Sequence, residues 1–155
     1  MKLFIGEFYM RLFSYFGAEN KEFWKEKIRS FDWGAAKFLA DILEQNRFDE
    51  LLYGGDLFIL ADGDELVSFC TLTRQDCIED KSLCPWIGFV YTADAYRGHR
   101  YSGRVIDFAC SYAARMGFDR VYLATDHIGL YEKYGFTYLE NRKDVYGDDS
   151  RIYYR

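Results

Sequence analysis

The chain has 155 residues, of which 50% are hydrophobic and 20% aromatic. This length suits one domain, and the composition excludes a disordered chain because so many apolar side chains need a packed interior. The formal net charge of −5 excludes a non-specific nucleic-acid binder, since such a protein neutralises phosphates with a basic surface. We therefore expect no nucleic-acid partner, and a cationic small molecule suits the charge better.

The cysteine pattern argues against a metal site, and the hydropathy argues against a membrane location. The four cysteines form no C-x-x-C pair and the two histidines complete no familiar zinc spacing, so we expect no metal site. We find no leader with a signal-peptide pattern, and no uncharged apolar run reaches the roughly 18 residues of a membrane span. We therefore expect a cytoplasmic protein with reduced thiols and no membrane partner.

The first third of the sequence has mainly helical periodicity. Residues 20–48 carry apolar side chains three and four positions apart, which predicts helices, and Gly34 marks a break. Residues 1–16 are rich in aromatic side chains, some of them at helical spacing. Helix and strand both stay open for that first segment.

The middle of the sequence predicts three strands. Residues 56–61 and 66–73 are apolar and flank an Asp-Gly turn, which predicts an antiparallel hairpin. A polar, acid-rich connection follows, and Pro85 then opens a third apolar strand over residues 86–91.

The last third alternates helices and strands, which favours one mixed α/β sheet over the whole chain. The helix that begins near Tyr101 has Gly117 as its expected C-terminal cap. The remaining predicted elements are a strand over 121–125, a short helix over 128–134, and a hairpin of 137–146 with 151–154.

A basic loop between a strand and a helix is the most informative stretch. Residues 96–104 read YRGHRYSGR. Backbone N–H groups and the positive end of the helix dipole would meet at such a loop, which favours a bound phosphate or pyrophosphate. The loop lacks the Lys-Ser or Lys-Thr of a Walker A motif and the three glycines of a dinucleotide fingerprint. Neither nucleotide motif fits.

Two motifs together resemble the GNAT acetyltransferase superfamily. Its acyl-coenzyme A loop reads Arg-Gly-x-Gly-x-Gly or Ala; here residues 97–98 match, whereas Arg100 and Ser102 stand where small residues are usual. Residues 129–136 read GLYEKYGF and resemble the Leu-Tyr-Glu-Lys-x-Gly-Phe signature of the same superfamily. The motifs occur in the expected order, and the resemblance covers residues 57–140.

The resemblance implies a fold and its division along the chain. It implies a single-domain α/β fold, with a mixed, mainly antiparallel sheet, flanking helices and a splayed central strand pair. A first strand would fall near the start of the chain. Residues 1–55 would form a mainly helical acceptor-side region, 56–140 the acyl-CoA-binding core and 141–155 a C-terminal hairpin.

The resemblance also implies acetyl-CoA as cosubstrate. A strand backbone would pair with the pantetheine arm, and the loop would bind the pyrophosphate. The expected binding residues are Val90, Tyr91, Thr92, Arg97, Gly98, His99, Arg100, Tyr101, Ser102, Gly103, Asp126 and Tyr131. For Arg97 and His99 the alternative is a solvated loop side chain, and for Asp126 it is a cap on the next helix.

The acid and the base have different support. Tyr131 matches the superfamily tyrosine that protonates or hydrogen-bonds the leaving thiolate. Many relatives carry a glutamate on the strand equivalent to 86–91, and this sequence has no carboxylate there. We therefore expect Glu79 or Asp80 to act as base, with Asp76 as a further candidate, through water.

The function implied is N-acetylation of a primary amine by direct attack. No cysteine lies within either motif, which argues against an acetyl-enzyme. The alternative is a non-catalytic acyl-CoA-binding sensor or interaction module of the same fold. The acceptor, a small-molecule or peptide amine, is not specified by the sequence, and the protein could be a monomer or a homodimer. Residues 31–33 would contact the acceptor or, alternatively, belong to the core.

Overall fold

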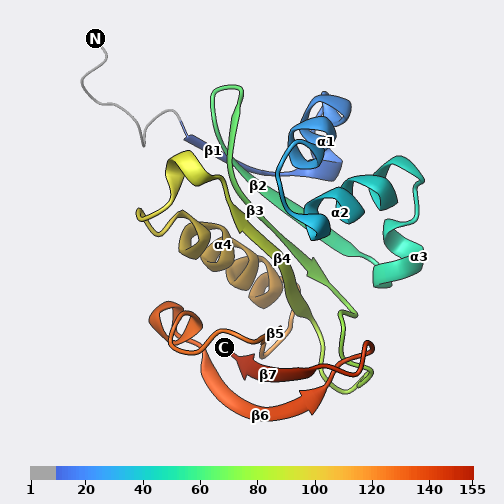
Figure 1. Cartoon of the computed structure of the whole chain (residues 1–155), viewed down its shortest axis with the longest axis vertical. Helices are drawn as coiled ribbons and strands as arrows, with labels where there is room; N and C mark the ends of the chain where they lie inside the picture. The colour runs from blue at the N-terminus through green and yellow to red at the C-terminus, as the bar shows by residue number, and fades with distance from the viewer. Residues whose placement is uncertain (1–9) are drawn as a thin grey trace.

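The computed structural model describes residues 10–155 as one α/β domain around a mostly antiparallel sheet. Within these residues seven strands follow the order β1-β2-β3-β4-β5-β7-β6. Helix α4 covers one face of the sheet, while α1 and α2 cover the other (Figure 1). The strands are β1 Met10–Ser14, β2 Gly55–Asp62, β3 Glu65–Thr73, β4 Trp86–Thr92, β5 Tyr122–Thr125, β6 Thr137–Lys143 and β7 Asp149–Tyr154. The helices are α1 Lys21–Arg29, α2 Gly34–Glu44, α3 Phe48–Leu52 and α4 Tyr101–Arg115.

The predicted hairpin forms the centre of the sheet. β2 and β3 pair antiparallel up to Asp62 and Glu65, and Gly63 turns the chain with a φ of +57°. β1 pairs antiparallel with the outer edge of β2. This settles the open alternative in favour of a strand for Met10–Ser14. Tyr15 and Phe16 begin a short 3₁₀ turn, and residues 1–9 lie outside the described residues.

The fourth and fifth strands separate soon after they meet. They run parallel, with only Trp86 opposite Tyr122 and Ile87 opposite Leu123. Beyond Ile87 the backbone of β4 has no partner on its β5 side among the described residues. The splayed central pair that the resemblance implied is therefore present.

A β-bulge lies just beyond this point of separation. Between Phe69 and Thr71 the ladder of β3 advances two residues while β4 advances three, from Gly88 to Tyr91. The extra residue in β4 is accommodated with Phe89 at a φ of +48°, in the left-handed region that a bulky side chain rarely adopts. The bulge therefore bends β4 at the centre of the molecule.

The C-terminal hairpin is confirmed, with a topology that the sequence did not indicate. β7 lies between β5 and β6, so the last strand of the chain joins the hairpin to the main sheet. The predicted short helix over 128–134 is confirmed only for Tyr131–Tyr134, which form a 3₁₀ turn that ends at Gly135. The break at Gly34 and the end of α4 before Gly117 are confirmed.

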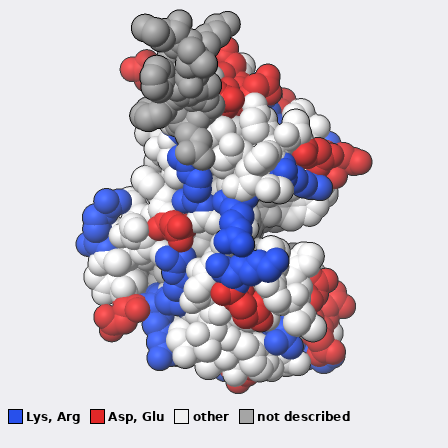
Figure 2. All heavy atoms as spheres, turned by 90° about the vertical axis from the view of Figure 1, so that its left-hand side faces the viewer, with Lys and Arg blue, Asp and Glu red and all other residues white. Residues whose placement is uncertain are grey.

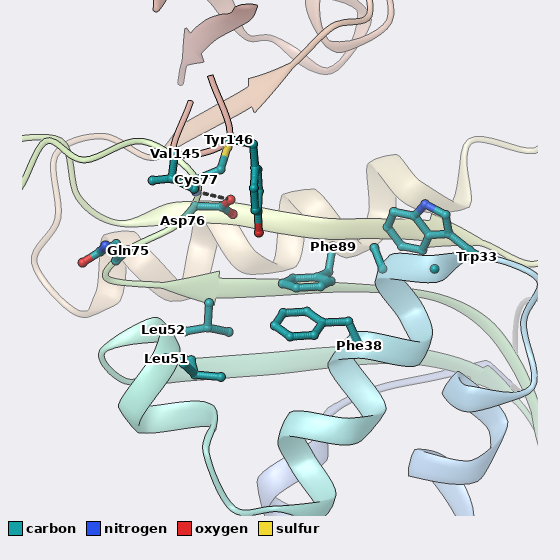
Figure 3. Close-up of a pocket in the computed structure, with 12 residues that line it drawn as sticks. Trp33, Phe38, Leu51, Leu52, Gln75, Asp76, Cys77, Phe89, Val145 and Tyr146 are labelled. Atoms are coloured by element: carbon teal, nitrogen blue, oxygen red, sulfur yellow. Dashed lines mark hydrogen bonds between the residues drawn. The ribbon is translucent and has the colours of Figure 1, made fainter. Parts of the chain in front are cut away.

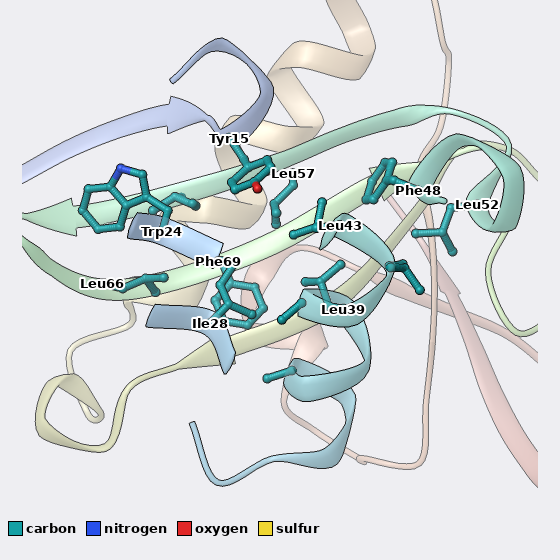
Figure 4. Packing of buried hydrophobic residues seen from close by; sticks show 14 of the residues in the cluster. Tyr15, Trp24, Ile28, Leu39, Leu43, Phe48, Leu52, Leu57, Leu66 and Phe69 are labelled. Carbon is teal, nitrogen blue, oxygen red and sulfur yellow. The ribbon is translucent and has the colours of Figure 1, made fainter. Parts of the chain in front are cut away.

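The core has one part on each face of the sheet. Leu39, Leu57 and Phe69 belong to the part beneath α1 and α2 (Figure 4). On the other face, Val105 of α4 belongs to the same buried cluster as Tyr131. Because Phe89 packs against the first part and Val90 against the second, consecutive residues of β4 reach both faces at the point of separation.

Candidate active site

The basic loop has the backbone geometry of an anion site. Gly98 has a φ of +87° and Arg100 one of +59°, so the loop turns twice through the left-handed region before α4 begins. Within the described residues, the N–H groups of residues 98–103 donate to no protein acceptor. The first N–H groups of any helix have no acceptor within the helix, and such unpaired donors attract anions.

Basic side chains surround these donors. A cavity of about 300 Å³ is lined by residues of the loop, among them Arg100, and by Lys133. Figure 2 views this side of the molecule and shows blue basic side chains in a band across it, although the chain as a whole is acidic. Arg97 also lines the cavity, yet its Nε donates to the carbonyl oxygen of Thr92 at 3.1 Å and its guanidinium pairs with Asp94 at 3.0 Å.

The two small residues at the start of α4 hold a tyrosine in place. The hydroxyls of Ser102 and Tyr134 lie 3.0 Å apart in a hydrogen bond. A Cβ at Gly103 would lie 2.7 Å from the ring of Tyr134, so only glycine leaves room for that ring. Gly103 thus has a packing role here.

Tyr131 lies on the α4 face of the sheet in an apolar environment. Its ring packs 6.1 Å from that of Phe136 and 6.5 Å from that of Tyr153. Burial raises the pKa of Tyr131 to about 12, so its hydroxyl stays protonated and remains a hydrogen-bond donor at neutral pH.

Two other residues expected at the cofactor site are exposed. The side chain of Asp126 is 90% exposed, and His99 is also exposed on the loop. The alternative role for Asp126, as a helix cap, is wrong, because Leu130 precedes the 3₁₀ turn and makes no side-chain cap.

A larger cavity of about 600 Å³ lies on the other face of β4, between α2, α3 and the hairpin turn. Its walls are mainly aromatic and aliphatic (Figure 3). Trp33, expected as a contact, lines it and stacks on Tyr91 with ring centroids 5.2 Å apart. Phe31 instead packs against Tyr91 and Phe69 in the core. Sequence reasoning missed several wall residues, namely Phe38, Leu51, Leu52, Phe89, Val145 and Tyr146.

One carboxylate faces this cavity beside the point where β4 leaves β5. A Cβ built on Gly88 would lie 2.1 Å from Asp76 Oδ2, so the carboxylate occupies the space that a side chain at residue 88 would need. Asp76 Oδ1 accepts a hydrogen bond from the N–H of Cys77 at 2.6 Å. Burial raises the pKa of Asp76 above its ordinary value.

A hydroxyl without a partner lies at the same place. Thr71 is fully buried, and its Oγ1 is 3.2 Å from the position of the Cβ built on Gly88. Within the described residues this oxygen has no hydrogen-bond partner. The separation point therefore carries a polar pair, Thr71 and Asp76, in otherwise apolar surroundings.

The two carboxylates expected to act as base lie elsewhere. Asp80 Oδ2 pairs with Arg142 at 2.6 Å and its Oδ1 accepts from Ser82, and these contacts lower the pKa of Asp80 to about 2. Glu79 is exposed and lines a separate surface hollow with Asp80. Neither side chain lines the cavity that Asp76 enters.

A thiol also lines the large cavity. Burial and the neighbouring Asp76 raise the pKa of Cys77 to about 12. A thiol in this environment stays protonated at neutral pH, which makes it a poor nucleophile.

Within residues 10–155 no group of three potential metal ligands gathers. A search of the same residues for a helix suited to crossing a membrane found none.

The sequence model of the Acetyltransferase (GNAT) family matches residues 18–136, which include the basic loop and Tyr131. The chain belongs to this GNAT acetyltransferase family. Comparison with curated protein sequences gave no match.

Solved structures share the fold of this GNAT chain at low sequence identity. An acetyltransferase from Streptococcus agalactiae has a TM-score of 0.65 and 19% identity, with 95% of this chain and 98% of that chain covered. A GNAT family acetyltransferase from Elizabethkingia anophelis, with acetyl-CoA bound, has a TM-score of 0.65, 13% identity and coverage of 94% and 97%. A Salmonella typhimurium enzyme that modifies the N-terminal serine of ribosomal protein L7/L12 has a TM-score of 0.66, 13% identity and 94% coverage of each chain.

Proposed function

We propose that the protein transfers the acetyl group of acetyl-CoA to a primary amine by direct attack. One observation carries this proposal: β4 leaves β5 at Gly88. The loop N–H groups, which have no acceptor among residues 10–155, lie on the α4 face, and the cavity with the Asp76 carboxylate lies on the opposite face. Two substrates could thus meet at a gap in the sheet. Acetyl-CoA supplies the activated acetyl group.

The loop residues fit the pyrophosphate of this cosubstrate. Within the described residues, the N–H groups of residues 98–103 have no protein acceptor and lie just before or in the first turn of a 15-residue helix, and Arg100 and Lys133 add positive charge. We assign the remaining expected binding residues to the same site, with Arg97 acting from the edge of the cavity because it is paired to Asp94. Asp126 and His99 would contact the cosubstrate only from solvent.

The unpaired edge of β4 would bind the pantetheine arm. Val90, Tyr91 and Thr92 lie beyond the last pair with β5. The carbonyl oxygens of Tyr91 and Thr92 already accept from Ser68 Oγ and Arg97 Nε, so the N–H groups of this edge are the better candidates. An N–H group at this edge would donate to the thioester oxygen as negative charge develops there. The strand would thereby orient the acetyl group toward the gap.

Side chains from the two faces of the sheet would handle the proton and the leaving group. As the amine nitrogen bonds the acetyl carbon, Asp76 Oδ2 accepts the proton that the nitrogen loses. As the carbon–sulfur bond breaks, the Tyr131 hydroxyl donates a hydrogen bond to the departing sulfur. The geometry favours Asp76 over Glu79 and Asp80 as base, since Asp76 alone of the three lines the cavity.

Calorimetric titration with acetyl-CoA tests the proposal. Gly98→Trp places a large side chain in the anion loop, so we expect the micromolar binding of the wild type to be lost. Gly63→Trp is the matched control, because Gly63 also has a positive φ and open space around it but lies in the β2–β3 turn. Loss of binding in both variants, or no binding by the wild type, would contradict the proposal.

A further inference from the structure

We propose that the acceptor is a monoamine whose amino group is joined by a short link to an apolar body of aromatic size. This inference rests on the proposed function, and it specifies the substrate class that the 600 Å³ cavity would select. A cavity of this size lies within the usual range for small-molecule sites.

Aromatic rings line the cavity, and two of them pack against each other on the same side. Phe38 and Phe89 stack with their planes 22° apart and their centroids 6.4 Å apart, and Tyr146 closes the side nearest Asp76 (Figure 3). Phe89 reaches this position through its left-handed backbone conformation at the bulge. Flat apolar walls of this kind favour a flat apolar ligand.

The cavity has one negative charge. Among residues 10–155, Asp76 is the only acidic side chain that lines it, and it lies against Gly88, where the acetyl group would be presented. One amine can therefore be paired there. A second ammonium group on the same ligand would have to lose water beside apolar walls without a partner, which is costly.

The opposite end of the cavity disfavours a second cation for a further reason. The first residues of α2, Gly34 and Ala35, line it, and the N-terminus of an 11-residue helix carries partial positive charge. The absence of a side chain at Gly34 leaves space there, since nothing lies within 4 Å of its Cβ position. This end suits the uncharged part of the ligand.

The wall that carries Tyr146 is held in place. The N–H of Val145 donates to the carbonyl oxygen of Cys77 at 2.8 Å, so the hairpin turn is tied to the segment of Asp76. The N–H groups of Tyr146 and Asp148 both donate to Asp144 Oδ1, at 2.9 and 3.0 Å. A fixed turn gives the cavity a defined shape, which suits a small ligand rather than a long polypeptide.

Release of free thiol from acetyl-CoA, measured with an amine panel, tests this inference. The panel contains 2-phenylethylamine, spermidine, kanamycin and a short peptide with a free N-terminus. We expect kcat/KM to be about tenfold or more higher for 2-phenylethylamine than for the others. A preference for spermidine, kanamycin or the peptide would overturn the inference.

Two variants locate the preference in the cavity. Phe38→Ala should lower kcat/KM for 2-phenylethylamine about fivefold or more, while Phe23→Ala, an exposed aromatic of α1 outside the cavity, should not change it. Tyr146→Ala should act like Phe38→Ala, and its folding is not at risk because Tyr146 is 78% exposed. Unchanged kinetics in Phe38→Ala and Tyr146→Ala would also overturn the inference.

The failure of the inference and that of the proposed function give different results. If the wild type binds acetyl-CoA and acetylates amines but prefers polycations, only the substrate class is wrong. If it neither binds acetyl-CoA nor releases thiol with any amine, the proposed function itself fails.

Discussion

Asp76 and Gly88 form a matched pair of residues. The carboxylate lies where a Cβ of residue 88 would be, so the glycine is required for space and not for an unusual backbone conformation. Burial raises the pKa of this carboxyl group, and a raised pKa makes a carboxylate a better base. The same burial places a charge in an unfavourable environment, so the site combines reactivity with a cost in stability.

We predict that Asp76→Asn lowers kcat/KM roughly 100-fold, the lower range of general base catalysis. The wild-type rate should fall as the pH drops through a pKa above the ordinary aspartate value, because the protonated carboxyl group cannot accept a proton. The measurement is the pH profile of kcat/KM for both proteins. If Asp80→Asn loses activity while Asp76→Asn keeps it, the assignment of the base is wrong.

The thermal midpoint of the same variant provides an independent check. A carboxyl group whose pKa is raised by folding destabilises the native state where it is ionised. Asp76→Asn should therefore raise Tm at pH 7, and this gain should vanish as the pH falls below the aspartate pKa of the unfolded chain. Asp80→Asn should do the opposite at pH 7, because contacts with Ser82 and Arg142 lower the pKa of Asp80.

At the scale of elements, the start of α4 depends on the packing of Gly103 against Tyr134. We predict that Gly103→Ala destabilises the fold by about 1–3 kcal/mol, as overpacking does, and weakens acetyl-CoA binding because Tyr134 and Ser102 must move. Urea denaturation measures the first effect and calorimetry the second.

Gly34→Ala is the matched control for this substitution. It also adds a methyl group to a glycine in a helix, but nothing lies within 4 Å of its Cβ position. We expect its stability to equal or exceed that of the wild type, since alanine has the higher helix propensity. Equal losses in Gly103→Ala and Gly34→Ala would refute the packing explanation.

Elements with a strong local signal were predictable from the sequence. The Asp-Gly turn fixed the β2–β3 hairpin, and the periodicity after the loop predicted α4. Apolar residues over 8–16 have helix-like spacing, yet Met10–Ser14 is a strand because β2 offers it an edge to pair with. Local pattern does not contain that information, since a neighbouring strand can override propensity.

The candidate site was predictable in part. The loop and Tyr131 followed from two motifs, whereas the position of Asp76 depends on how residues 74–85 fold back against Gly88. That segment has no periodicity, so no local pattern favoured Asp76 over Glu79 and Asp80, the two carboxylates expected to act as base. The roles proposed for all of these residues stay predictions until variants are measured.

For the whole molecule, the net charge did not predict where basic side chains gather on the surface. A net charge of −5 suggested a cationic ligand, yet the face that carries the loop gathers basic side chains (Figure 2). The placement of β7 between β5 and β6 was likewise not visible in the sequence, because the order of strands in a sheet is set by long-range pairing. That placement brings the hairpin turn with Val145 and Tyr146 to the cavity.

The opening of the sheet at Gly88 also bears on the order in which the two substrates could bind. Because the anion loop lies on the α4 face and the large cavity on the α2 face, neither substrate would block the entry of the other. Double-reciprocal plots at several fixed amine concentrations should therefore intersect, as for a ternary complex, instead of running parallel, as for a ping-pong scheme. Coenzyme A should accordingly inhibit competitively against acetyl-CoA, and the acetylated amine should not.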